Sequence, residues 1–163
     1  MKPLKRVLYL LFFLSFYAHA TPDNIYTASV KGDFDRTYKA VYQALENNRL
    51  FVVFEPDIGA NLSGFAKRWG EDYNRNKLEH FKAMMFCNGW YANQVSNKDV
   101  KMTALCPLHV TLTHKNGLTS VHFVRPDRVA RNSKAAAITQ ELTELVIKAI
   151  TEGLANSKKT TPP

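Results

Sequence analysis

Two cysteines are the residues whose chemistry is easiest to specify in this sequence. Cys87 ends an apolar, β-rich run and Cys106 precedes the next one. If the two strands are neighbours, both sulfur atoms lie at the same end of the sheet. A bridge between them would enclose 18 intervening residues, and loop-closure entropy gives such a crosslink roughly 3 kcal/mol of stabilisation. In an oxidising compartment this pair predicts a structural disulfide. A reversible thiol pair is the alternative, although the Cys-x-x-Cys spacing of redox enzymes is absent.

Soft-metal binding is a third reading of the same region. Cys106 and His109 lie three residues apart, and further sulfur and imidazole groups are near in sequence at Cys87, His80, Met84, Met85 and Met102. Thiolate, thioether and imidazole suit Cu(I) or Zn(II) better than magnesium or calcium. However, side chains three apart on a strand point to opposite faces, and adjacent methionines cannot share one site. We therefore favour a structural disulfide or a reversible thiol pair over a metal site.

The residues after Cys87 suggest where a ligand would bind. Asn88 is of a type that caps a helix, and the aromatic Trp90 follows it. We expect a ligand site at this end of the sheet, made by Asn88, Trp90, His80 and His109 around the cysteine pair. A helix start would favour the thiolate of Cys87 if the protein were instead a thiol-redox or sulfur-handling enzyme.

Signatures of other enzyme classes are missing. The sequence has no Gly-x-Ser-x-Gly, no His-Glu-x-x-His and no glycine-rich phosphate loop. We therefore expect a non-enzymatic binding or accessory domain, assign no catalytic residue and expect no cofactor. A basic row recurs every three residues at Arg125, Arg128, Arg131 and Lys134. Such a row can hold a phosphate headgroup or an acidic partner, although charge rows are usually solvated.

The apolar periodicity predicts the elements that position these residues. Strands are predicted at 25–30, 50–54, 79–86, 108–114 and 118–124. The second is expected to be well buried, and Asn116-Gly117 favours a tight hairpin between the last two. Helices are predicted at 34–47, 58–69, 89–95 and 134–152, with caps at Asp33, Asn88 and Ser133 and an end at Gly153. This order predicts an α+β, two-layer sandwich with a mostly antiparallel sheet and helices on one face.

Two short motifs resemble the domain-of-unknown-function family 302. The segment Phe86-Cys87-Asn88-Gly89-Trp90-Tyr91-Ala92 resembles the family's strand-end motif, and Pro107-Leu108-His109-Val110 resembles the entry to its hairpin. The sequence departs from the pattern at Gly89, where proline is usual, and at Leu108, where some members have a second cysteine. Cys106 lies two residues earlier. The resemblance implies a small α+β domain that can form a homodimer, and it carries no agreed activity.

The N-terminal residues predict export. Lys2, Lys5 and Arg6 precede an apolar run at 7–17, and Ala18-His19-Ala20 favours cleavage before Thr21. The run is too short to span a bilayer. We expect a cleavable signal peptide at 1–20, a single domain at 21–153 and a flexible tail at 154–163, in the periplasm or secreted. Loss of three cations lowers the formal charge from +8 to +5. That modest excess favours an anionic envelope surface or a small-molecule ligand over nucleic acid as partner.

Overall fold

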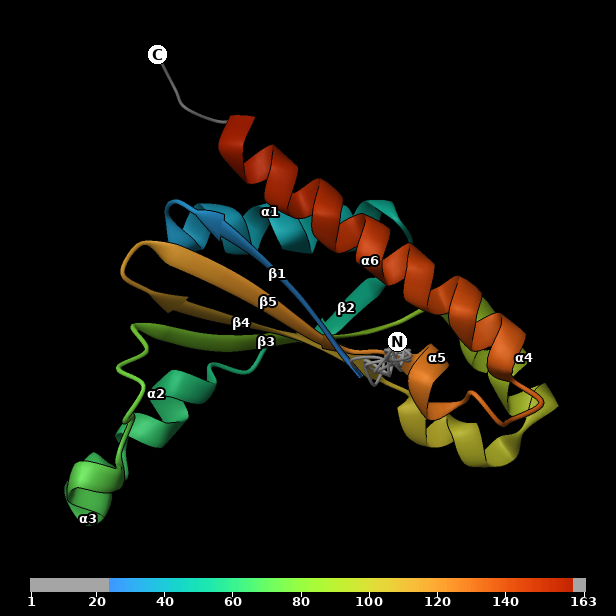
Figure 1. Ribbon diagram of the computed structural model, residues 1–163, viewed down its shortest axis with the longest axis horizontal. Helices are drawn as coiled ribbons and strands as arrows, with labels where there is room; N and C mark the ends of the chain where they lie inside the picture. Colours follow the sequence, from blue (N-terminus) through green and yellow to red (C-terminus); the bar gives the residue numbers. More distant parts are fainter. Residues whose placement is uncertain (1–23, 160–163) are drawn as a thin grey trace, which may run out of the picture.

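The structure is a computed structural model that describes residues 24–159. Its sheet has the order β1-β5-β4-β3-β2, and every neighbouring pair is antiparallel. The strands are β1 (Ile25–Lys31), β2 (Phe51–Phe54), β3 (His80–Cys87), β4 (Leu108–Lys115) and β5 (Leu118–Val124). Two long helices, α1 (Phe34–Asn47) and α6 (Ala136–Lys159), lie side by side over one face of the sheet (Figure 1). The predicted α+β class is confirmed.

The core lies between the sheet and these two helices. Because strand side chains alternate between faces, one set from β3, β4 and β5 points toward the helices and is almost fully buried: Met84, Phe86, Val110, Leu112, Val121 and Phe123. The helices supply the other side of the core with Val41, Leu45, Val146 and Ile150. Burial of a large aliphatic or aromatic side chain contributes about 1.5–3 kcal/mol, so this layer is the main source of stability.

The predicted end of the last helix at Gly153 is wrong. Gly153 lies inside α6, which continues to Lys159. A β-carbon at Gly153 would stand 2.6 Å from Cα of Val41 on α1, closer than real contacts allow. The glycine therefore permits the two helices to approach each other and does not stop the helix. The last four residues of the expected tail, and the expected signal peptide with its cleavage site, lie outside the described residues.

The predicted burial of the second strand is also wrong. β2 is an edge strand, and Phe51, Val53 and Phe54 are 53%, 65% and 59% exposed. Only Leu50, just before the strand, is fully buried. A short apolar run looks the same in sequence whether one or both of its faces are covered, so the pattern alone could not separate the two cases.

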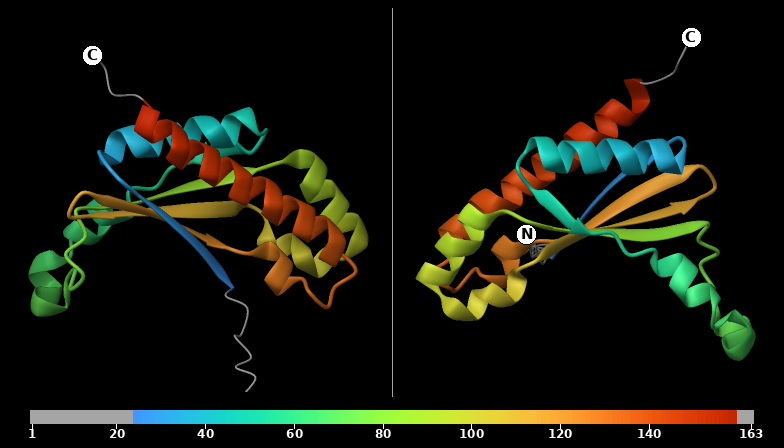
Figure 2. Two further views of the ribbon diagram at one scale, coloured as in Figure 1. Left: turned by 45° about the horizontal axis from the view of Figure 1, so that its top comes forward. Right: turned by 180° about the vertical axis from the view of Figure 1, so that it is seen from behind.

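The opposite face of the sheet carries polar side chains. Ser29 on β1 hydrogen bonds Ser120 on β5 at 2.8 Å between their Oγ atoms. The ring of His122 on β5 lies between two hydroxyls, with Nδ1 3.1 Å from Thr27 Oγ1 and Nε2 3.2 Å from Thr113 Oγ1. Among the described residues, α1 and α6 both lie on the other side of the sheet (Figure 2).

Shorter elements extend from the two ends of the sheet. At one end, α2 (Ile58–Ser63), α3 (Ala66–Trp69) and the 3₁₀ turn η1 (Gly70–Asp72) form an arm that projects away from the sheet (Figure 2). At the other end lie α4 (Gly89–Lys98), the 3₁₀ segment η2 (Val100–Leu105) and α5 (Pro126–Val129). Within residues 24–159, no helix combines the length and apolar character that a membrane span requires.

Candidate functional site

The turn from β3 into α4 is fixed by Asn88. Its side-chain oxygen accepts hydrogen bonds from the backbone N–H groups of Trp90 and Tyr91, at 3.1 and 3.2 Å. Its amide nitrogen donates to the carbonyl oxygen of Arg49 at 3.0 Å, which joins this turn to the chain entering β2. The first turn of a helix has unpaired N–H groups, and Asn88 satisfies two of them. Cys87, directly before this cap, is thereby held at the end of β3.

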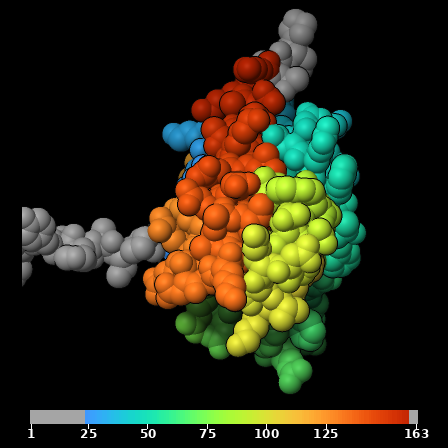
Figure 3. Space-filling view, turned by 90° about the vertical axis from the view of Figure 1, so that its right-hand side faces the viewer, coloured from blue at the N-terminus to red at the C-terminus, as the bar shows by residue number. Residues whose placement is uncertain are grey.

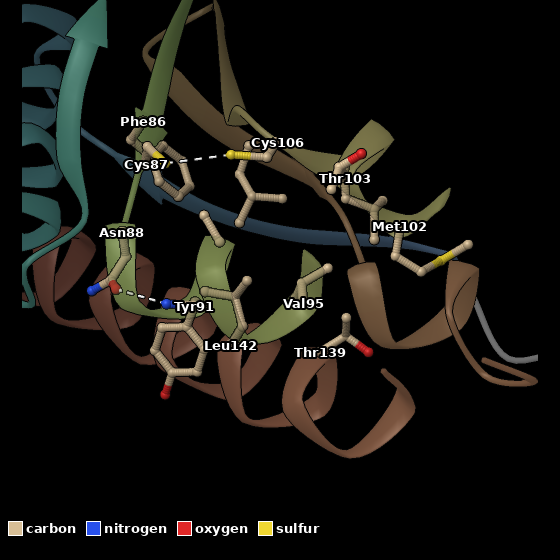
Figure 4. Close-up of a pocket in the computed structure, with 13 residues that line it drawn as sticks. Phe86, Cys87, Asn88, Tyr91, Val95, Met102, Thr103, Cys106, Thr139 and Leu142 are labelled. Carbon is tan, nitrogen blue, oxygen red and sulfur yellow. Dashed lines mark hydrogen bonds between the residues drawn. The ribbon is translucent and has the colours of Figure 1, made fainter. Parts of the chain in front are cut away.

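The structure brings the two cysteines together. Strands β3 and β4 are neighbours, and Cys106, at the end of η2, enters β4 beside the end of β3. The two Sγ atoms are 3.4 Å apart, and both residues are free thiols (Figure 4). A disulfide bond requires about 2.05 Å, so a small side-chain movement separates this pair from a bridge.

The thiol of Cys106 is held in its protonated form. Burial, together with the hydrogen bond and charge of Cys87, raises the pKa of Cys106 to about 11. A group with that pKa is almost entirely protonated at neutral pH, so Cys106 is a poor nucleophile and a poor metal ligand until its partner reacts or a metal displaces its proton.

An apolar cavity of about 230 Å³ lies directly against the cysteine pair. Its walls come from the end of β3, from α4, from η2 and from the first turns of α6. Figure 4 shows side chains from these elements around the same space. Phe86 and Tyr91 contribute rings, and aliphatic or thioether groups come from Val95, Met102, Leu105 and Leu142. The site is thus a small apolar pocket with two thiols in its wall.

The other predicted site residues are placed elsewhere. His80 begins β3, at the far end of the strand from Cys87, and its ring stacks on Phe34 with centroids 4.2 Å apart. His109 lies opposite Met85 in the sheet register and does not line the cavity. Trp90 is 57% exposed and packs edge-on against Tyr91, outside the lining. Of the predicted ligand-site residues, only Asn88 borders the cavity with the two cysteines.

The metal hypothesis gains no ligand set from this arrangement. Met84 is buried in the core between sheet and helices. Met102 lines the cavity, but its sulfur lies on the side away from the cysteines (Figure 4). In the part of the chain that the structure describes, no group of three histidine, cysteine or acidic side chains is arranged to hold a metal ion.

Sequence reasoning missed most of the cavity wall. Thr139 and Leu142 come from the last helix, more than 30 residues after Cys106, and nothing local marks them as pocket residues. The apolar periodicity does not predict η2, although Asp99 caps it by accepting a hydrogen bond from the N–H of Lys101 at 3.1 Å. An acidic residue before an apolar run was the one available signal.

Comparison with known proteins gives a family but no activity. The family model described as "Domain of unknown function DUF302" matches residues 26–153. A crystal structure of an uncharacterized conserved protein DUF302 from Bacillus stearothermophilus is similar in fold, with a TM-score of 0.67 and 17% sequence identity. The alignment covers 79% of this chain and 97% of that one. No curated protein matches the chain.

Proposed function

This chain belongs to the family Domain of unknown function DUF302, and from that premise we propose that it is an exported, non-enzymatic domain that binds a small apolar molecule. The observation that carries the proposal is the apolar cavity of about 230 Å³ whose wall contains Cys87 and Cys106. The site forms where β3, α4 and the start of β4 meet, at the two segments that resemble the family's strand-end and hairpin-entry motifs.

The size of the cavity limits the ligand. An engineered apolar cavity of about 150 Å³ binds benzene, so by volume this one holds a group of about nine non-hydrogen atoms. That size fits a bicyclic aromatic or a short branched chain. Two hydroxyls in the wall do not need a ligand partner, because Thr139 donates to the carbonyl oxygen of Ala136 and Thr103 donates to that of Val100. An apolar group can therefore enter without leaving an unpaired polar group behind.

The two cysteines in the pocket wall could make the shape of the pocket depend on their oxidation state. We propose that after export, two thiols at 3.4 Å lose two protons and two electrons to a disulfide oxidant, which is itself reduced to two thiols. The product is a Cys87–Cys106 disulfide that ties the end of β3 to the end of η2. Because both sulfurs lie in the cavity wall, the bridge would fix the pocket in one shape, which reduces the entropic cost of binding.

Binding is tested with the chain that begins at Thr21, titrated with naphthalene-sized aromatics and followed by amide chemical shifts in NMR spectra. Ala92 lines the cavity, and Ala92→Phe should fill it and abolish saturable shifts at the cavity residues. Ala137→Phe, at an exposed position of α6, is the matched control and should bind as the wild type does. The proposal is wrong if no small apolar molecule produces saturable shifts, or if both variants bind alike.

A thiol-redox protein is the second candidate, favoured by the contact between the two sulfurs. In this alternative Cys87 attacks a substrate disulfide and Cys106 resolves the mixed disulfide. The reduction potential distinguishes the two: structural disulfides of exported proteins fall below about −300 mV, whereas redox enzymes lie at roughly −120 to −270 mV. Equilibration with glutathione buffers and intact-mass readout after alkylation measures it. A potential in the higher range would replace the binding proposal with the redox one.

A further inference from the structure

Basic side chains gather at the end of the molecule that carries η2 and α5. We call this surface the basic tip, defined as residues 98–104 and 125–134. These two segments contain six cations and two carboxylates. They are joined by a hydrogen bond from Ser133 Oγ to Asp99 Oδ2 at 2.7 Å. Figure 3 looks onto this end, where the two segments lie next to each other in yellow and orange.

Both carboxylates of the basic tip are already engaged within it. Asp99 accepts hydrogen bonds from Ser133 and from the N–H of Lys101. Asp127 accepts two from Arg125, at 3.1 and 2.8 Å, and lies 3.5 Å from Arg128. The remaining cations are exposed and, within residues 24–159, make no salt bridge to a carboxylate: Lys98, Lys101, Arg131 and Lys134. Two of them, Lys101 and Lys134, also interact electrostatically with Asp99. The six cations and two carboxylates of the basic tip leave a net charge of +4 for a partner.

Two exposed valines lie among these cations. Val100, between Asp99 and Lys101, is 71% exposed, and Val129, next to Arg128, is 52% exposed. A polyanion such as nucleic acid would use the cations but would gain little from uncovered valines. The interface of a bilayer with anionic lipids accommodates both, because lysine and arginine meet the headgroups while apolar side chains enter the acyl boundary.

From this combination we propose that the basic tip docks on the surface of an anionic lipid bilayer. Each lysine or arginine near such a surface contributes about 1 kcal/mol, which corresponds to about fivefold in partitioning. Four such charges, the net excess of the basic tip, therefore give a preference for anionic over zwitterionic vesicles of about 600-fold at low ionic strength. Salt screens the electrostatic contribution of the cations, so this part of the binding weakens as the ionic strength rises. The contribution of the valines remains.

The test is co-sedimentation of the chain from Thr21 with vesicles of phosphatidylglycerol and phosphatidylcholine in equal amounts, compared with phosphatidylcholine alone. Lys101→Gln/Lys134→Gln should lower partitioning to the anionic vesicles by about 25-fold. The matched control, Lys31→Gln/Lys115→Gln, changes the net charge equally. Both of its positions are exposed and pair with Leu118, at the other end of the sheet, so this variant should bind as the wild type does.

Three further measurements separate this proposal from its alternatives. Val100→Ser/Val129→Ser should reduce the binding that survives at high salt. Ala92→Phe, which fills the apolar pocket, should leave vesicle binding unchanged, so the docking surface and the pocket fail independently. The proposal is overturned if phosphatidylcholine vesicles bind equally well, or if both lysine pairs have the same effect. It is also overturned if duplex DNA binds as tightly as the vesicles and the valine variant changes neither.

Discussion

Replacing Gly153 by alanine tests how closely α1 and α6 approach each other. In an exposed helix, the change from glycine to alanine stabilises by about 1 kcal/mol. At this position the new β-carbon would lie 2.6 Å from Cα and 3.0 Å from the backbone nitrogen of Val41. A side chain can rotate away from such a contact, but these are backbone atoms. The two helices must therefore move apart.

The expected change in the free energy of unfolding follows from two opposing effects. Overpacking a tight core contact costs about 1–3 kcal/mol, and backbone partners put this site near the upper end. After the gain in helix propensity, we expect Gly153→Ala to lower the free energy of unfolding by about 2 kcal/mol. For a domain of this size that corresponds to a fall in Tm of roughly 8 °C. The sign is opposite to the one that helix propensity alone predicts.

Urea unfolding followed by circular dichroism measures this difference. Ala155→Gly, at an exposed position two residues further along α6, is the matched control and should lose only about 1 kcal/mol, the propensity difference. If Gly153→Ala is as stable as the wild type or more stable, the close approach of α1 and α6 is not the reason for the glycine, and the packing argument fails.

Three other predictions concern the pocket and the open face of the sheet. Oxidation to the Cys87–Cys106 disulfide should raise the free energy of unfolding by about 3 kcal/mol, measured with and without dithiothreitol, and Cys106→Ser should show no such difference. Asn88→Ala removes the acceptor for two N–H groups and should cost about 1–2 kcal/mol and weaken ligand binding, whereas Asn88→Asp keeps the acceptor and should recover part of both. Burial lowers the pKa of His122, so below about pH 6.5 the unfolded chain binds this proton more readily than the folded one and stability falls as pH falls. Urea unfolding at neutral and mildly acidic pH should show that acidification lowers the free energy of unfolding less in His122→Gln than in the wild type.

Features that depend on adjacent residues could be predicted from the sequence. Asp33 and Asn88 cap the helices that follow them, as expected, because a cap contacts N–H groups only two or three residues away. Asn116 and Gly117 both have positive φ angles, 50° and 72°, as the hairpin turn requires. The contact between Cys87 and Cys106 was also predictable, since it needed only that two consecutive strands be neighbours.

Features that depend on distant elements could not be predicted in this way. The exposure of β2 follows from its position at the sheet edge, which is decided by the pairing of four other strands. Glycine is a residue type common at helix ends. Only the approach of Val41, more than 100 residues earlier, shows that Gly153 is needed for helix packing. The pocket likewise needs Leu142 from α6 to close a space begun at Cys87.

The two proposed sites share one short element, η2. Its residues Met102 and Leu105 line the apolar pocket, while Val100 and Lys101 belong to the basic tip. Coupling between two sites is reciprocal, so the unchanged vesicle binding expected of Ala92→Phe also means that the bilayer does not alter the affinity of the pocket. In this arrangement the bilayer brings the ligand close to the pocket and the pocket binds it on its own. The proposed disulfide joins Cys106 at the end of η2 to β3, so it restrains the same segment. An apolar ligand is poorly soluble in water and concentrated in lipid, so it would be captured where η2 meets the bilayer surface. The oxidation state of the cysteines would determine how far η2 can move relative to β3.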